Sequence, residues 1–137
     1  LVALHGWGEQ AADFVEPWRP AANAGLLVAV PESSHELTPG FFVWGDRERA
    51  RDDVARALSS LRREWDLDEE RGLYAGFSQG GGLAVSWALA DARKLHETLR
   101  RGGVSFDLHV VPGLGHDLPD DLDERLTEAL HLLLPLT

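Results

Sequence analysis

The sequence predicts an α/β domain in which helices cover both faces of a mostly parallel sheet. Two observations support this prediction: short apolar runs alternate with amphipathic stretches, and a glycine or a proline follows each apolar run. No repeat or low-complexity segment interrupts the pattern. A chain of 137 residues has the length of one domain, so we expect a single domain over residues 1–137.

The first half of the chain begins with an unbroken apolar run at residues 1–4, which is typical of a buried parallel strand. The sequence His-Gly-Trp-Gly follows it as a sharp turn. A short helix is expected around residues 10–15, and Pro17 and Pro20 should interrupt what comes next. Residues 26–30 predict a second strand.

A loop is expected next, over residues 33–45, because it holds proline, glycine and two adjacent aromatics. Residues 46–65 have a helical pattern, with Val54 and Leu58 on one apolar stripe. Residues 73–75 predict a third short strand.

The second half continues the alternation of strands and helices. A helix should begin after Ser78 and run at least to residue 90. Residues 106–111 predict a fourth strand, which a proline and glycine turn follows. The last helix is expected at residues 122–134, with Asp120 or Asp121 placed to cap it.

Composition narrows the function classes. Lys and Arg number 13 against 23 Asp and Glu, which gives a net charge of −10. This charge repels nucleic acids and anionic lipid surfaces, so we expect neither nucleic acid nor stable membrane association among the partners. The chain has no cysteine, which excludes disulfides, thiolate metal ligands and a cysteine nucleophile. No apolar run approaches the roughly 20 residues that span a bilayer. We therefore expect a cytoplasmic enzyme or binding domain.

The most specific motif is Gly-Phe-Ser-Gln-Gly at residues 76–80, which fits G-x-S-x-G between a predicted strand and a predicted helix. A serine on so tight a turn adopts strained backbone angles, which requires small residues two before and two after it. The turn exposes the Ser78 hydroxyl and directs the Gln79 N–H at the oxygen of a tetrahedral intermediate. The alternatives are an ordinary glycine-rich turn and a phosphate loop. The acidic chain and the lack of G-K-[S/T] disfavour the phosphate loop.

A general base for this serine should lie late in the chain, because the order in such folds is Ser, acid, His. Among six histidines, His116 alone follows a predicted strand and a glycine-rich turn. The alternative is that His116 caps the last helix. His5 is expected to be structural, whereas Gly6 lets the chain turn so that the Trp7 N–H faces the reacting carbonyl.

Together, these three segments resemble the α/β-hydrolase superfamily, and more narrowly its phospholipase/carboxylesterase branch, which includes acyl-protein thioesterases. Residues 76–81 are close to that branch's nucleophile signature, and Trp44 with Asp46 resembles its Trp-x-Asp segment. The resemblance extends over nearly the whole chain in the expected order. It implies a three-layer α/β-hydrolase fold with a mostly parallel sheet.

The resemblance also implies an activity. Ser78 would be the nucleophile, His116 the general base, and the backbone N–H groups of Trp7 and Gln79 the oxyanion hole. The substrate would be a small carboxylic or thio ester of an acyl chain, and no metal or cofactor is implied. Aromatic loop residues could form the apolar walls of its site, although such residues more often belong to the core. These residues are Trp7, Phe41, Phe42 and Trp44.

The catalytic acid has no clear candidate. Only 38 positions separate Ser78 from His116, where the family carries a further strand and an aspartate-bearing loop. Asp91 resembles the start of the helix after that loop, so the acid should precede it. Asp107 lies on the predicted strand and should face a helix or solvent. Asp117 neighbours His116, and adjacent side chains usually point apart.

We therefore expect that the sequence lacks a segment near residues 90–91 that carries the acid, together with N-terminal strands of the fold. A first residue that is not Met, and no Met anywhere, fit this expectation. If the chain is continuous, the base is unoriented, and loss of the acid costs on the order of 10⁴-fold in rate. The rival function is then a non-catalytic hydrolase-fold binding module that keeps Ser78.

Overall fold

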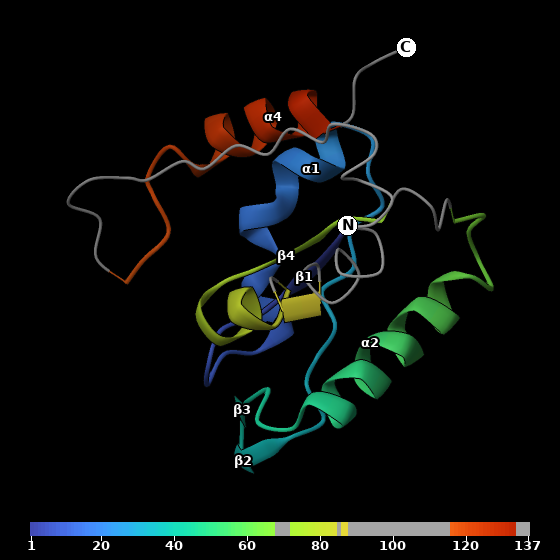
Figure 1. Cartoon of the computed structure of the whole chain (residues 1–137), viewed down its shortest axis with the longest axis vertical. Coiled ribbons are helices and arrows are strands. Elements are labelled where there is room, and N and C mark those ends of the chain that lie inside the picture. The colour runs from blue at the N-terminus through green and yellow to red at the C-terminus, as the bar shows by residue number, and fades with distance from the viewer. Residues whose placement is uncertain (68–71, 85, 88–115, 134–137) are drawn as a thin grey trace, which may run out of the picture.

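The structure, a computed structural model, describes residues 1–67, 72–84, 86–87 and 116–133. These residues form a mixed α/β arrangement (Figure 1). The strands are β1 (Val2–Leu4), β2 (Glu36–Thr38), β3 (Phe41–Phe42) and β4 (Tyr74–Gly76). The helices are the 3₁₀ turns η1 (Ala11–Phe14) and η2 (Glu16–Trp18), and α1 (Arg19–Asn23), α2 (Arg47–Leu61) and α4 (Leu122–Leu133).

A small parallel sheet is built around β1. Strand β4 pairs with it in parallel, with Val2 opposite Tyr74. On its other side, Ala29 forms a parallel bridge with Val2, and the Ala3 N–H donates to the Ala29 carbonyl at 2.9 Å. The predicted parallel pairing is therefore confirmed. The strand expected at residues 26–30 is reduced to this one bridge, in which Ala29 donates its N–H to the Leu1 carbonyl at 2.9 Å and accepts from Ala3.

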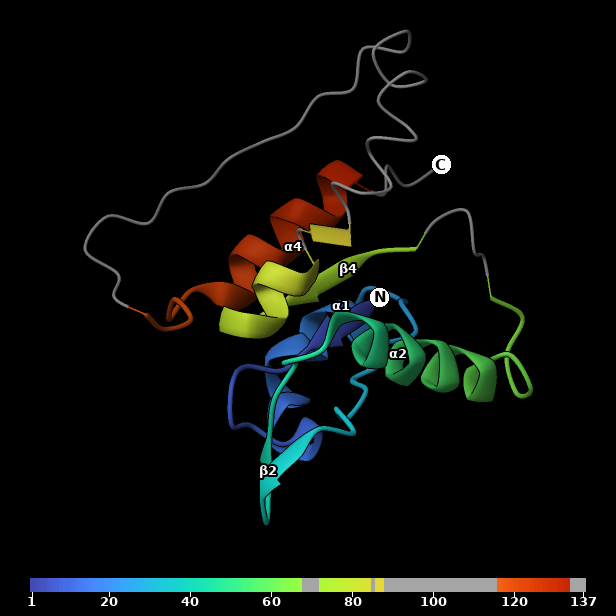
Figure 2. The same ribbon diagram turned by 60° about the horizontal axis from the view of Figure 1, so that its bottom comes forward.

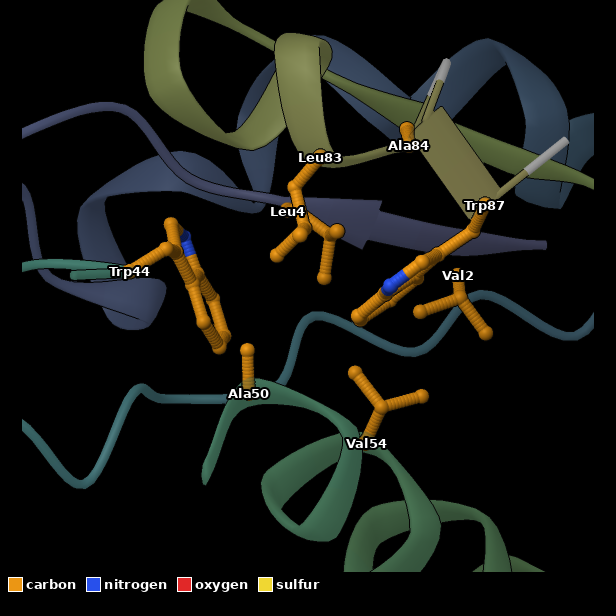
Figure 3. Packing of buried hydrophobic residues seen from close by; sticks show 8 residues of the cluster. All are labelled: Val2, Leu4, Trp44, Ala50, Val54, Leu83, Ala84 and Trp87. Carbon is orange, nitrogen blue, oxygen red and sulfur yellow. The ribbon is translucent and has the colours of Figure 1, made fainter. Parts of the chain in front are cut away.

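Side chains alternate across β1 and enter a core on each face of the sheet, as the period of a strand requires. Val2 and Leu4 pack with α2 and with the helix after β4, and Figure 3 shows both side chains pointing toward Ala50 and Val54. Ala3 faces the other core, which includes Leu126 of α4. Helices α2 and α4 thus lie on opposite sides of the sheet (Figure 2), as the sequence predicts.

The prolines after residue 15 break the helical structure there into short elements, as expected. Pro17 lies in the first turn of η2 and Pro20 in the first turn of α1. A proline at the start of a helix loses no intrahelical hydrogen bond and already has helical φ, so each proline lies where a new short element begins. Helix α1 packs against α4 (Figure 1).

The predicted loop at residues 33–45 is also corrected. It contains an antiparallel hairpin of β2 and β3. Its tip is Pro39-Gly40, and Gly40 has a φ of +77°. Proline followed by a left-handed glycine is the residue pair of a type II turn, so the sequence carried a hairpin signal.

The helix predicted at residues 46–65 and the strand predicted at residues 73–75 are both present, with slightly different bounds. Helix α2 is capped by Asp46, whose carboxylate accepts the Glu48 and Arg49 N–H groups, and it ends at Leu61, short of residue 65. Strand β4 is shifted by one residue from residues 73–75. The predicted strand at 106–111 lies outside the described residues, as does the part of the preceding helix beyond residue 87.

Helix α4 begins as predicted at Leu122. The Asp121 carbonyl accepts the Arg125 N–H at 3.1 Å, while its carboxylate accepts from Arg125 Nε at 2.7 Å. This hydrogen bond to the Arg125 guanidinium holds the pKa of Asp121 below its ordinary value. Within the described ranges, no helix has the length and apolar content needed to cross a membrane.

Candidate active site

Ser78 lies at the junction between β4 and the helix that follows it. The strand ends at Gly76, and helical structure begins at Ser78 itself. Its φ is +50°, and no other non-glycine residue in the described part of the chain has a positive φ. This conformation is costly for a residue with a Cβ and is retained where surrounding structure enforces it. The geometry has the strain that the motif predicts.

The glycines on either side of Ser78 explain how the turn is enforced. A Cβ on Gly80 would lie 2.6 Å from the Leu4 carbonyl carbon and closer still to the Leu4 and His5 carbonyl oxygens. A Cβ on Gly76 would lie 2.6 Å from the carbonyl carbon of Gly80. Because backbone atoms block both positions, no side-chain adjustment can relieve these overlaps. The expected need for small residues at these two positions is confirmed.

The structure brings His116 into contact with Ser78, although the two residues are 38 positions apart in the sequence. His116 Nε2 lies 2.7 Å from Ser78 Oγ, and the pair is exposed. The His116 ring also packs on Phe77, with ring centroids 5.2 Å apart. With its proton on Nδ1, a neutral imidazole can accept the serine O–H through Nε2. This is the geometry that a general base requires.

The turn after β1 packs directly against the serine turn. A Cβ on Gly6 would lie 3.0 Å from the Phe77 ring. His5 is fully buried, its Nδ1 lies 2.8 Å from the Gly6 carbonyl, and its Nε2 lies 3.3 Å from the Ser33 nitrogen. Nδ1 can donate to the Gly6 carbonyl, and Nε2 also lies 3.4 Å from Glu32 Oε1. The position of His5 matches the structural role expected for it.

Glu9 also contributes to this turn and was not identified from the sequence. Its Oε2 accepts the Gly6 N–H at 2.6 Å. The signal that could have found it is a carboxylate three residues after a glycine N–H, as in capping motifs.

The two expected oxyanion donors are Trp7, in the turn after β1, and Gln79, in the first turn of the helix. The N–H groups in the first turn of a helix have no acceptor within the helix. The Gln79 N–H can therefore donate a hydrogen bond to a ligand. The close approach of Gly80 to Leu4 and His5 brings the two segments together. The Gln79 side chain, which sequence reasoning left unused, accepts the Trp44 N–H through Oε1 at 2.7 Å.

The four aromatic residues expected to line the site separate into two groups. Trp7 is 61% exposed and contacts Phe41 edge to face, with centroids 4.7 Å apart. Phe42 is half-buried, and its carbonyl accepts the Gly8 N–H at 2.8 Å. Trp44 is instead 5% exposed and packs in the core (Figure 3), so it forms no open wall.

No carboxylate in the described part of the chain forms an ion pair with His116. Asp117 Oδ1 accepts the N–H of Leu118 instead, at 2.8 Å. Asp91, Asp107 and the expected missing segment near residues 90–91 lie outside the described residues. Over the same ranges, no three His, Asp or Glu side chains are grouped so as to hold a metal ion.

Comparisons with known proteins bear on the fold. Neither a scan against models of protein families nor a search of curated proteins finds a match for this chain. Among solved structures, an uncharacterized protein from Bacillus cereus ATCC 10987 is similar, with a TM-score of 0.73 and 20% sequence identity. The match covers 98% of this chain and 58% of that protein. At this identity the similarity shows a shared fold alone.

Proposed function

We propose that this chain carries the active site of a serine hydrolase that cleaves carboxylic or thio esters. The observation that carries the proposal is the strained Ser78, whose Oγ lies 2.7 Å from Nε2 of His116. Strain is retained at functional sites because an exposed, preorganised group is needed there. The resemblance of the motifs supports assignment to the phospholipase/carboxylesterase branch and its three-layer α/β-hydrolase fold.

In the proposed reaction, His116 Nε2 accepts the hydroxyl proton as Ser78 Oγ forms a bond to the acyl carbon. The carbonyl oxygen becomes an oxyanion, which the N–H groups of Trp7 and Gln79 stabilise. His116 then returns the proton to the departing alkoxide or thiolate, which leaves an acyl-serine. A water that His116 deprotonates attacks this ester, and His116 returns the proton to Ser78 Oγ as the acyl bond breaks, which releases the carboxylic acid and restores the serine hydroxyl.

A non-catalytic binding module with the same fold is the second candidate. One observation favours it: the carboxylates described in the structure leave His116 without an ion pair, and an unoriented base is a poor catalyst. Such a module would keep Ser78 and its turn but would not activate the hydroxyl.

Labelling with a fluorophosphonate distinguishes these candidates, because this probe reacts with activated serines. Intact protein treated with the probe should gain the mass of one adduct, and peptide mapping should locate it on Ser78. Ser78→Ala should gain none. An unlabelled wild-type protein that is folded by circular dichroism would favour the binding module.

The pairing of Trp7 with Phe41 supports an apolar acyl site beside the oxyanion turn. Trp7→Ala keeps the backbone N–H but removes an exposed apolar wall. We expect kcat/KM for p-nitrophenyl octanoate to fall about ten-fold, with a smaller change for p-nitrophenyl acetate. Trp65→Ala is the matched control, because Trp65 is 56% exposed and follows α2. Equal losses on both esters in Trp7→Ala would contradict the acyl-site assignment.

A further inference from the structure

The Gln79 side chain connects the serine turn to the turn after β1 through Trp44. Gln79 Oε1 accepts the backbone N–H of Trp44 at 2.7 Å, although the two residues are 35 positions apart. Trp44 in turn donates its Nε1–H to the His5 carbonyl at 2.9 Å. Two hydrogen bonds therefore join the residue after the nucleophile to the residue that precedes Gly6 and Trp7.

The middle of this connection is buried and closely packed. The rings of Trp44 and His5 are in contact, with centroids 4.8 Å apart, and both residues are buried. Ser33 fixes the backbone next to Trp44, because its Oγ donates to the Val43 carbonyl at 2.6 Å. Figure 3 shows the Trp44 indole beside Ala50 in the core. Hydrogen bonds in such surroundings are strengthened by the low local dielectric.

This connection acts on the peptide that carries one of the proposed oxyanion donors. The Gln79 N–H belongs to the peptide bond between Ser78 and Gln79, and Ser78 has the strained φ of +50°. A rotation of that peptide would change ψ of Ser78 and φ of Gln79 and would turn the N–H away from the reacting carbonyl. The hydrogen bond from Trp44 holds the Gln79 side chain and so opposes the rotation.

We propose that Gln79 is a positioning residue, whose side chain, through Trp44 and His5, sets the separation of the Gln79 and Trp7 N–H groups. This inference rests on the proposed function, because it concerns the oxyanion hole of the same reaction. The connection contributes to rate by preorganising two donors, which need no rearrangement as charge develops on the oxygen.

The test compares Gln79→Leu, which removes the acceptor, with Gln79→Glu, which keeps an oxygen at the same position. Turnover of p-nitrophenyl butyrate is divided by the fraction of sites labelled with fluorophosphonate, so that misfolded protein does not count. We expect Gln79→Leu to lower kcat and kcat/KM equally, by about 10- to 100-fold. Gln79→Glu should recover most of that loss. Thermal unfolding of each variant reports any structural effect separately.

Trp44→Phe tests the second hydrogen bond, since it keeps an aromatic ring but lacks the donor to His5. The double variant should lose less kcat than the two single variants would lose if their effects were independent, because both hydrogen bonds belong to one connection. The proposal is overturned if Gln79→Leu and Trp44→Phe both keep kcat per labelled site within about two-fold of wild type. It is also overturned if Gln79→Glu loses as much as Gln79→Leu. Failure of the proposed function differs from both results, because wild-type protein would then not be labelled at Ser78.

Discussion

Ser78→Ala is expected to lower kcat for p-nitrophenyl butyrate by on the order of 10⁴- to 10⁶-fold. The change removes the Oγ proposed to form the acyl bond, which is also the partner of His116 Nε2, so only substrate binding and the proposed oxyanion donors remain. The variant should fold normally, because alanine carries the same Cβ at the strained position. Steady-state hydrolysis, with Tm measured alongside, checks this expectation.

Ser86→Ala is the matched control for that experiment. Ser86 lies in the same helix, and its Oγ donates to the Leu83 carbonyl at 2.8 Å rather than to a histidine. It should keep the wild-type kcat and KM. Undiminished turnover in Ser78→Ala would remove the basis of the serine hydrolase proposal, whatever the control shows.

Gly80→Ala is expected to destabilise the fold by about 3 kcal/mol or more. The new Cβ would overlap the Leu4 and His5 carbonyl groups, which belong to the central strand and its turn and cannot move aside as a flexible side chain could. Urea unfolding followed by circular dichroism should show a lower midpoint with an unchanged slope. In protein that remains folded, fluorophosphonate labelling of Ser78 should slow as the turn is displaced.

Gly82→Ala separates this steric effect from helix propensity. Gly82 lies in the same helix, and a Cβ there meets no atom within 4 Å. Alanine should therefore stabilise the protein by about 0.5–1 kcal/mol, because it lowers the conformational entropy of the unfolded chain. Equal midpoints for the two variants would mean that the close approach at Gly80 does not constrain the turn.

Several elements were predictable because their causes lie within a few residues. The strand, turn and helix around Ser78 follow from G-x-S-x-G, since glycines two residues away decide whether the turn can form. Helix α2 follows from its apolar stripe, whereas its cap by Asp46 was not identified from the sequence. The hairpin tip at Pro39-Gly40 had an equally local cause, and it was overlooked because the apolar pattern around it is short.

The Ser78–His116 pair was predictable in a different way. Chain order and the glycine-rich turn pointed to His116, but their approach to 2.7 Å is a property of the folded chain. Trp44 illustrates the limit of this reasoning. An aromatic residue in a loop has the same local sequence whether it lines a site or fills the core, so its burial could not be inferred from its neighbours.

The sequence by itself determined the α/β alternation, the serine turn and the residue types available for its chemistry. Tertiary structure alone decided which groups meet: Gln79 with Trp44, Trp44 with His5, and His116 with Ser78. These pairs are 35, 39 and 38 positions apart. The physical reason is the distance along the chain over which each interaction acts. Backbone sterics and turn preferences act over a few residues, whereas hydrogen bonds between distant segments form only after packing has brought those segments together.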